Sequence, residues 1–227
     1  MKQVVDPAKN LSALLEKLDK PEQPVETLDP LDTLIESFLM WDSTRVKAKA
    51  AYELLMQSVV DYNDLRVSVP GEIAAYMGEN YPQAEERAQS IKLVLRDIYL
   101  REHEVTLKSL TDKGKREIKK YLRSLDGMVG YVADRVMLLC YSIHCIPADD
   151  FLRRALADIN ACDGSQELPE LASWLTRHIK ASQAVTTHFA LQKWVDEKPG
   201  EETSTTRKKT TNKKSPRQTA SSSRKST

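Results

Sequence analysis

Two adjacent carboxylates, Asp149 and Asp150, stand at the predicted start of a helix that carries Arg153 and Arg154. A carboxylate held in a partly dry cleft can stabilise positive charge that develops on a substrate, and it can orient or deprotonate an attacking water. An aspartate in this place also has a plain structural role, because an N-cap aspartate stabilises a helix by about 1 kcal/mol. The two roles are compatible, and the choice between the two aspartates stays open by one residue.

A glycine-containing turn lies upstream, between two predicted helices, and includes Gly127, Val129 and Gly130. Such a turn leaves backbone N–H groups without partners at the start of the second helix, where they and the helix dipole can hold a phosphate. Contacts of this kind bind nucleic acid without reading its sequence. The alternative is that Asp126 and Gly127 merely end one amphipathic helix before another begins.

The turn and the aspartate, in this order, resemble the helix-hairpin-helix glycosylases of base-excision repair, the endonuclease III-like group. The hairpin of that family has the form Leu-Pro-Gly-Val-Gly-x-Lys-Thr-Ala, and its catalytic aspartate follows in Val-Asp-Thr-His-x-x-Arg. Placed on this pattern without gaps, Leu125, Gly127 and Ala133 agree. Val129 stands at the second glycine. If the turn is one residue longer, the adjacent Gly130 supplies the positive φ that Val129 cannot adopt cheaply.

The resemblance extends over about residues 28 to 196, in family order. The segment from Asp29 to Leu39 is similar to the family's opening helix, which begins with Asn/Asp-Pro and continues through an apolar run. Residues 43 to 51 are similar to the next helix, and residues 87 to 91 to the Lys-Ala-x-x-Ile that starts the long helix before the hairpin. No single element is specific, whereas the order of the five is.

The resemblance implies a role for each matched position. Asp149 is the expected catalytic carboxylate, or Asp150 if the alignment slips. Tyr131 stands where the bifunctional members carry a lysine that forms a Schiff base with the sugar, so hydrolysis without the lyase step is implied. The DNA-binding residues expected from the hairpin, the helices beside it and the basic C-terminal segment are Gly127, Val129, Gly130, Val132, Arg135, Arg153, Lys208, Lys209, Lys213 and Lys214.

Cofactor-binding cysteines are missing from the matched positions. Many members of the family carry four cysteines after a helix that resembles residues 187 to 194, and these hold an iron–sulfur cluster. Here no cysteine follows Cys162, so we expect no iron–sulfur cluster and no other cofactor. The three cysteines lack paired spacing and the four histidines form no ligand pair, so no metal site is expected.

The formal net charge of +1 is the sum of two unlike parts. Residues 203 to 227 contain eight basic residues and no acidic one. Subtracting these eight from the chain's 34 basic residues leaves 26 against 33 acidic residues in positions 1 to 202, a net charge of −7. The basic segment lacks core-forming residues and is expected to be disordered. It would raise affinity for DNA by counterion release, or else be an extension without a role.

Apolar residues recur at helical spacing in most segments, as in residues 91 to 98, and no segment alternates convincingly as a strand does. We therefore predict an all-α protein. The resemblance adds that the helices form two lobes, with both chain ends in one lobe and the substrate cleft between the two. The predicted organisation is an N-terminal extension with a short helix in residues 1–28, a helix-hairpin-helix glycosylase-like domain in residues 29–196 and a disordered basic tail in residues 197–227.

No apolar run approaches the length needed to cross a bilayer, and the first six residues lack the apolar region of a signal peptide. We expect a soluble, intracellular protein of the cytoplasm or nucleoid, a monomer that binds damaged duplex DNA and no membrane. Three functions stay open. They are a monofunctional DNA glycosylase that removes a damaged or mismatched base through Asp149, a DNA-binding relative without the chemistry, and a helical scaffold or regulator with no nucleic-acid role.

Overall fold

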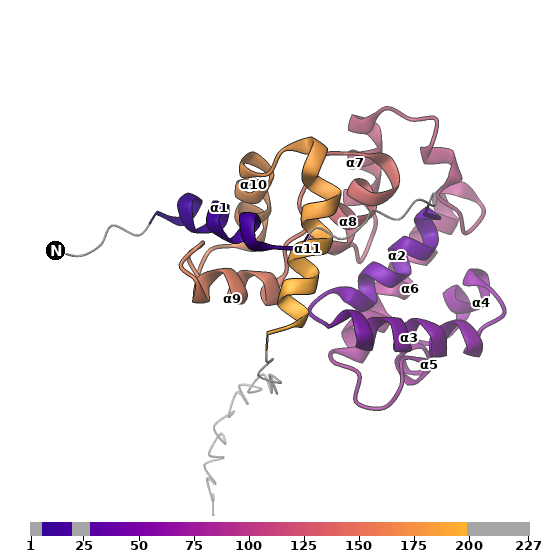
Figure 1. The fold of residues 1–227 in the computed structure, drawn as a ribbon. Helices are drawn as coiled ribbons and strands as arrows, with labels where there is room; N and C mark the ends of the chain where they lie inside the picture. Colours follow the sequence, from indigo (N-terminus) through magenta and orange to yellow (C-terminus); the bar gives the residue numbers. More distant parts are fainter. Residues whose placement is uncertain (1–5, 20–27, 199–227) are drawn as a thin grey trace, which may run out of the picture.

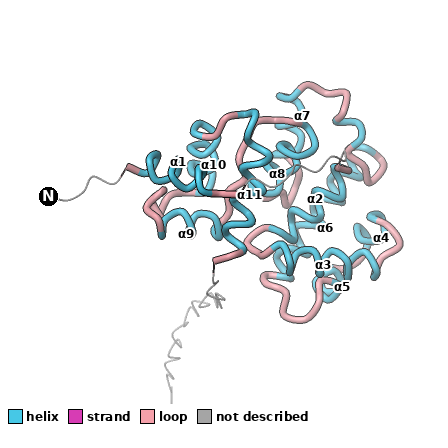
Figure 2. Tube along the Cα trace, in the orientation of Figure 1, coloured by secondary structure: helices cyan, strands magenta, loops and turns pink. Residues whose placement is uncertain are grey.

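Every regular element in residues 6–19 and 28–198, the part of the chain that the computed structural model describes, is a helix (Figure 2). The α-helices are α1 (Pro7–Lys17), α2 (Pro30–Met40), α3 (Arg45–Ser58), α4 (Tyr62–Val67), α5 (Pro70–Tyr76), α6 (Ala84–Glu102), α7 (Lys115–Arg123), α8 (Gly130–Tyr141), α9 (Asp150–Asp158), α10 (Leu168–His178) and α11 (Ala184–Asp196). Two short 3₁₀ turns, η1 (Lys108–Leu110) and η2 (Ala181–Gln183), complete the set. The all-α prediction is confirmed.

Aspartate–proline pairs begin the first two helices. Asp6 and Asp29 each accept hydrogen bonds from two N–H groups of the first turn, and a proline follows each of them. The aspartate satisfies donors that the helix itself leaves without partners, and proline has no N–H to lose at the first position. The start of α2, which the sequence comparison placed at Asp29, is therefore set by local chemistry.

Two hydrophobic cores divide the helices into two lobes (Figure 1). The first core runs from Leu31 to Ile143 and joins α2 to α8, whereas the second joins α1, α9, α10 and α11 through residues such as Leu11 and Leu171. Helix α8 contributes to both, because Met137 lies in the first core and Leu138 in the second. Two lobes with both ends of the described chain in one of them were predicted, and this arrangement is confirmed.

The helix of the N-terminal extension is part of the second lobe. Leu11 of α1 is fully buried there, and the amide of Asn10 donates hydrogen bonds to the carbonyls of Ile159 (3.2 Å) and Asn160 (3.0 Å) at the end of α9. Residues 1–5, 20–27 and 199–227 lie outside the described residues, so the predicted tail stays a prediction. No helix in the described part of the chain is long and apolar enough to span a membrane.

Helix α4 could not be predicted from the spacing of apolar residues. Helix α4 has six residues, too few to show a helical period, and it starts where Asp61 accepts a hydrogen bond from the N–H of Asp64 (2.8 Å). It packs against the long helix α6, and its Leu65 is fully buried. Both α4 and the turn between α7 and α8 pack against helix α6, so α6 positions the site described next.

Candidate functional site

The turn between α7 and α8 depends on one glycine. Gly127 has φ of +77°, and a Cβ atom there would lie 2.8 Å from Cβ of Leu93 and 3.0 Å from the carbonyl oxygen of Ser90, both on α6. Val129 has φ of −96° and is the N-cap of α8, and Gly130 is the first helical residue, with no positive φ. The longer turn with a left-handed Gly130 is therefore wrong, and Gly127 alone provides the left-handed residue of this turn.

The start of α8 is open. Among the described residues no side chain caps it, and Gly130 is exposed, with no atom within 4 Å of the position that a Cβ would take. The side chain of Val132 is fully buried, so only its backbone can serve a ligand. Backbone N–H groups of the first turn, together with the helix dipole, make such a start suited to an anion.

Two arginines expected to bind DNA make contacts with other residues of the protein. Arg135 is 3% exposed and donates hydrogen bonds to Oε2 of Glu36 (3.2 Å) and Oγ of Ser37 (3.0 Å) on α2, so the prediction that it contacts DNA is wrong. Arg153 is partly exposed, but it pairs with Asp150 (2.6 Å) and donates to the carbonyl of Gln166 (3.2 Å). The expected tail lysines, Lys208, Lys209, Lys213 and Lys214, lie outside the described residues.

Positive charge near the hairpin comes instead from α7, which carries five basic residues and one acidic residue. Lys119 and Lys120 are exposed, whereas Arg123 pairs with Asp134 of α8 (2.8 Å). Because α7 precedes the turn that leads to the open start of α8, the hairpin combines the positive charge of α7 with backbone donors of α8.

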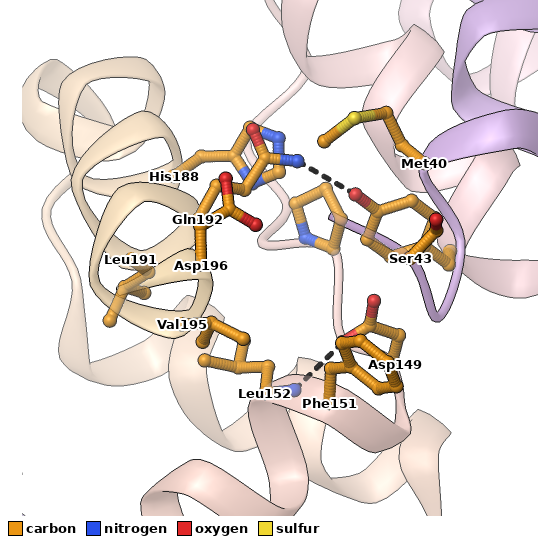
Figure 3. Close-up of a pocket in the computed structure, with 12 residues that line it drawn as sticks. Met40, Ser43, Asp149, Phe151, Leu152, His188, Leu191, Gln192, Val195 and Asp196 are labelled. Carbon is orange, nitrogen blue, oxygen red and sulfur yellow. Dashed lines mark hydrogen bonds between the residues drawn. The ribbon is translucent and has the colours of Figure 1, made fainter. Parts of the chain in front are cut away.

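A small pocket lies where the two lobes meet (Figure 3). The loop after α2, the head of α8, the start of α9 and one face of α11 enclose a cavity of about 30 Å³, room for about one water molecule. Figure 3 shows Asp149 and Ser43 on one side of this space and His188 and Gln192 of α11 on the other. The lining residues are Met40, Ser43, Tyr131, Pro147, Asp149, Phe151, Leu152, His188, Leu191, Gln192, Val195 and Asp196.

Asp149 is the titratable centre of the pocket. It is the N-cap of α9 and 7% exposed; its Oδ1 accepts a hydrogen bond from the N–H of Leu152 (2.8 Å) and its Oδ2 one from the N–H of Asp42 (3.2 Å). Burial, and then the nearby charge of Asp42, raise the pKa of Asp149 to about 7. Such a carboxyl can accept or release a proton near neutral pH. Its neighbour Asp150 is not among the lining residues and pairs with Arg153, so of the two aspartates only Asp149 faces the cavity.

Tyr131 lines the same pocket from the second position of α8. It is buried, and its hydroxyl accepts a hydrogen bond from Nε2 of Gln192 (2.7 Å). Burial and the charge of Asp149 raise the pKa of Tyr131, which keeps the phenol protonated. No lysine of the described residues lines the pocket, and Lys119 and Lys120 are exposed on α7.

Three polar residues of the site were not among the site residues predicted from the sequence. Asp42 reaches the start of α9 from the loop after α2, and His188 and Gln192 reach the pocket from α11. Burial, and next the charge of Arg135, hold the pKa of His188 well below its usual value, so its ring is neutral at neutral pH. Nε2 of His188 and Oε1 of Gln192 are buried without a partner in the described structure. Their helix could be predicted, but which of its faces meets the pocket depends on tertiary packing.

Comparison with known proteins identifies the fold. No protein-family model and no curated protein sequence matches the chain. Solved structures do match: a DNA covalent intermediate of endonuclease III, with TM-score 0.60, 15% identity and 82% of this chain and 84% of that chain covered. A thermostable thymine-DNA glycosylase has TM-score 0.56 and 15% identity over 83% of both chains. The 3-methyladenine DNA glycosylase of H. pylori, bound to 1,N6-ethenoadenine, has TM-score 0.58 and 12% identity over 82% of this chain and 95% of that one. The described chain therefore has the fold of the helix-hairpin-helix DNA glycosylases.

Proposed function

We propose that this protein is a DNA glycosylase that hydrolyses the bond between a damaged or mismatched base and its sugar, with Asp149 as the catalytic carboxylate. The observation that carries the proposal is the buried carboxyl group of Asp149, which faces a pocket between the two lobes of a glycosylase fold. Loss of the base leaves positive charge on the sugar, and an ionised Asp149 would stabilise that charge and accept a proton from the attacking water.

Substrate entry requires the pocket to widen. A cavity of about 30 Å³ holds one water and not a nucleobase, so an extruded base has to displace side chains of α11 or separate the lobes. The neutral His188 and the unpaired Oε1 of Gln192 are polar groups that a base entering along α11 would meet.

The proposed reaction stops at the abasic site. A lyase step needs an amine that forms an imine with the sugar, and the described pocket contains Tyr131 where a lysine would be required. The hydroxyl of Tyr131 is held by Gln192 and stays protonated, so it supplies neither an amine nor an alkoxide-like nucleophile. We therefore expect no covalent enzyme–DNA adduct.

DNA is the proposed partner of the hairpin. The uncapped start of α8 offers backbone N–H groups to a phosphate, and the exposed lysines of α7 offer positive charge beside it. These contacts hold the duplex by its backbone and leave base selection to the pocket. The basic residues 203 to 227 add a further tether that does not depend on sequence.

A DNA-binding relative without catalysis is the second candidate. It is favoured by one observation: both carboxylate oxygens of Asp149 already accept hydrogen bonds from the protein, in a pocket with room for about one water molecule. In that case Asp149 would be a helix cap alone.

Single-turnover incubation with duplexes that carry oxidised, deaminated, alkylated or mismatched bases separates the candidates. Alkali reveals abasic sites, and borohydride traps any imine. We expect alkali-dependent cleavage of at least one duplex, no trapped adduct, a rate at least about a hundredfold lower in Asp149→Asn and an unchanged rate in the matched control Asp150→Asn. The rate should rise with pH up to about 7, because the ionised carboxyl is the active form.

The other results point elsewhere. Binding without cleavage across the panel would favour the second candidate. Neither binding nor cleavage would favour a helical scaffold. A borohydride-trapped adduct would contradict the hydrolytic proposal.

A further inference from the structure

Asp42 makes a reciprocal contact with the start of α9. Its carboxylate Oδ1 accepts hydrogen bonds from the N–H groups of Asp150 (2.8 Å) and Phe151 (3.3 Å), and its own N–H donates to Oδ2 of Asp149 (3.2 Å). Asp42 is 8% exposed although it lies in the loop between α2 and α3. One residue of the first lobe thus satisfies two donors of the helix that carries Asp149 and one oxygen of Asp149 itself.

The backbone at Asp42 is held in the geometry that this contact needs. Asp42 has φ of +47°, a left-handed conformation that aspartate tolerates better than most residues. The fully buried guanidinium of Arg87, on α6, donates to the carbonyl oxygens of Asp42 (3.4 Å), Pro82 (2.8 Å) and Phe38. The loop is therefore fixed from α6, and Asp42 carries that constraint across to α9.

We infer that Asp42 is a positioning residue: it fixes the carboxyl group of Asp149 toward the pocket and joins the loop of one lobe to the start of α9 in the other. This inference rests on the proposed function, in which Asp149 acts on the sugar. A helix cap alone would need only the two hydrogen bonds to the carboxylate of Asp42. The third bond, from its backbone to Asp149, orients the reactive group and is the reason for the assignment.

Charge adds to the effect of position. Asp42 and Asp149 are both buried, and burial followed by repulsion from a neighbouring aspartate raises the pKa of each. The other groups with an electrostatic effect on this pair are Asp150 on α9, Arg87 on α6 and Tyr131 on α8. The neutral His188 of α11 lines the same pocket. Removing the charge of Asp42 should therefore lower the pKa of Asp149.

Two substitutions separate charge from position. Asp42→Asn keeps an amide oxygen that can accept from Asp150 and Phe151 but removes the charge. Asp42→Gly keeps the positive φ and the backbone N–H that donates to Asp149, but it removes the carboxylate that anchors this N–H against the start of α9. Asp61→Ala is the matched control, because it removes the N-cap of α4, away from the pocket.

The first readout is the carboxyl ¹³C titration of Asp149 in the full-length protein, which needs no turnover. We expect the pKa of Asp149 to fall by about one pH unit in Asp42→Asn and to stay unchanged in Asp61→Ala. The second readout is the rate of single-turnover base excision. We expect this rate to fall about tenfold or more in Asp42→Gly, whereas its affinity for the same duplex should stay unchanged. In Asp42→Asn the rate should be largely retained at pH values where Asp149 is ionised.

An Asp149 titration that does not move in Asp42→Asn, or wild-type excision by Asp42→Gly, would overturn the inference. Should Asp42→Gly fail to fold, Asp42→Ala, which also removes the carboxylate, takes its place in the excision assay. A wild-type protein that cleaves no duplex would overturn the proposed function instead, and the titration would still test the contact between the two aspartates.

Discussion

The starts of α8 and α9 are both helix N-termini near the junction of the lobes, but side chains cap only the start of α9. The start of α9 is closed: the carboxylates of Asp149 and Asp42 accept hydrogen bonds from three of its N–H groups, and both aspartates are buried. The start of α8 has no side-chain cap in the described structure and begins at the exposed Gly130. Each helix end attracts negative charge through the same dipole.

The difference lies in where the anion comes from. At α9 the protein supplies its own anions, the carboxylates of Asp42 and Asp149. Their burial disfavours the charged form, so the pKa of each aspartate is raised. At α8 the donors stay available for an anion from outside, and in this fold we propose a DNA phosphate. In the proposed function, one helix start holds the reactive group, and the other would hold the backbone of the substrate DNA.

The most damaging single change to this arrangement should be Gly127→Ala. A Cβ at this position would lie 2.8 Å from Leu93 and 3.0 Å from the carbonyl of Ser90, and φ is +77°. We expect a loss of about 3 kcal/mol in the free energy of unfolding, from backbone strain and overpacking together, measured by urea denaturation.

Gly71→Ala is the matched control for that change. Gly71 lies in the first turn of α5, no atom lies within 4 Å of its would-be Cβ, and its φ is not positive. We expect this variant to be as stable as the wild type or slightly more stable. Equal loss from both substitutions would show that the hairpin turn carries no special constraint.

The closed start of α9 should make stability fall as pH rises. The pKa of Asp149 is raised to about 7 in the folded protein, so the stability linked to its proton is present at low pH and is lost as pH rises through 7. Between about pH 5 and pH 8 the wild type should lose about 2 kcal/mol more than Asp149→Asn, which has no proton to release. Thermal denaturation at several pH values, with Asp150→Asn as control, measures this difference. Parallel pH profiles of the wild type and Asp149→Asn would contradict it.

The contrast between the two starts also explains what the sequence could predict. The helices, the turn at Gly127 and the choice of Asp149 over Asp150 as the first candidate rest on local signals and on their order along the chain. The prediction for Arg135 is wrong because the sequence does not distinguish an arginine that contacts DNA from a buried one that donates hydrogen bonds to Glu36 and Ser37, as Arg135 does. Asp42 carries no spacing signal, because its partners lie 107 and 108 residues away and are set by the packing of two lobes.

A negative charge at the open start should separate stability from DNA affinity. In Gly130→Glu the new side chain would meet no atom within 4 Å of its Cβ, so the protein should stay folded. The carboxylate of the new side chain should compete with a phosphate for the N–H groups of α8. We expect a roughly tenfold weaker affinity for duplex DNA, with stability unchanged or slightly raised. Gly130→Ala is the uncharged control and should bind DNA as the wild type does. Equal affinity of both variants for DNA, measured by fluorescence anisotropy, would exclude the proposed contact between a DNA phosphate and the start of α8.

The smallest expected effect on DNA affinity is that of deleting residues 203 to 227, which belong to neither helix start. Deletion of residues 203 to 227 removes eight basic residues and no acidic one, so affinity for DNA should fall severalfold at low salt and its dependence on salt should flatten. Because the tail would hold phosphates apart from the hairpin, its deletion should add to Gly130→Glu without interaction in a double-mutant cycle. An interaction larger than about 0.5 kcal/mol would mean that the tail acts through the same phosphates as α8. Unchanged binding and an unchanged salt slope after deletion would exclude the tether and leave α7 and α8 as the whole of the proposed DNA contact.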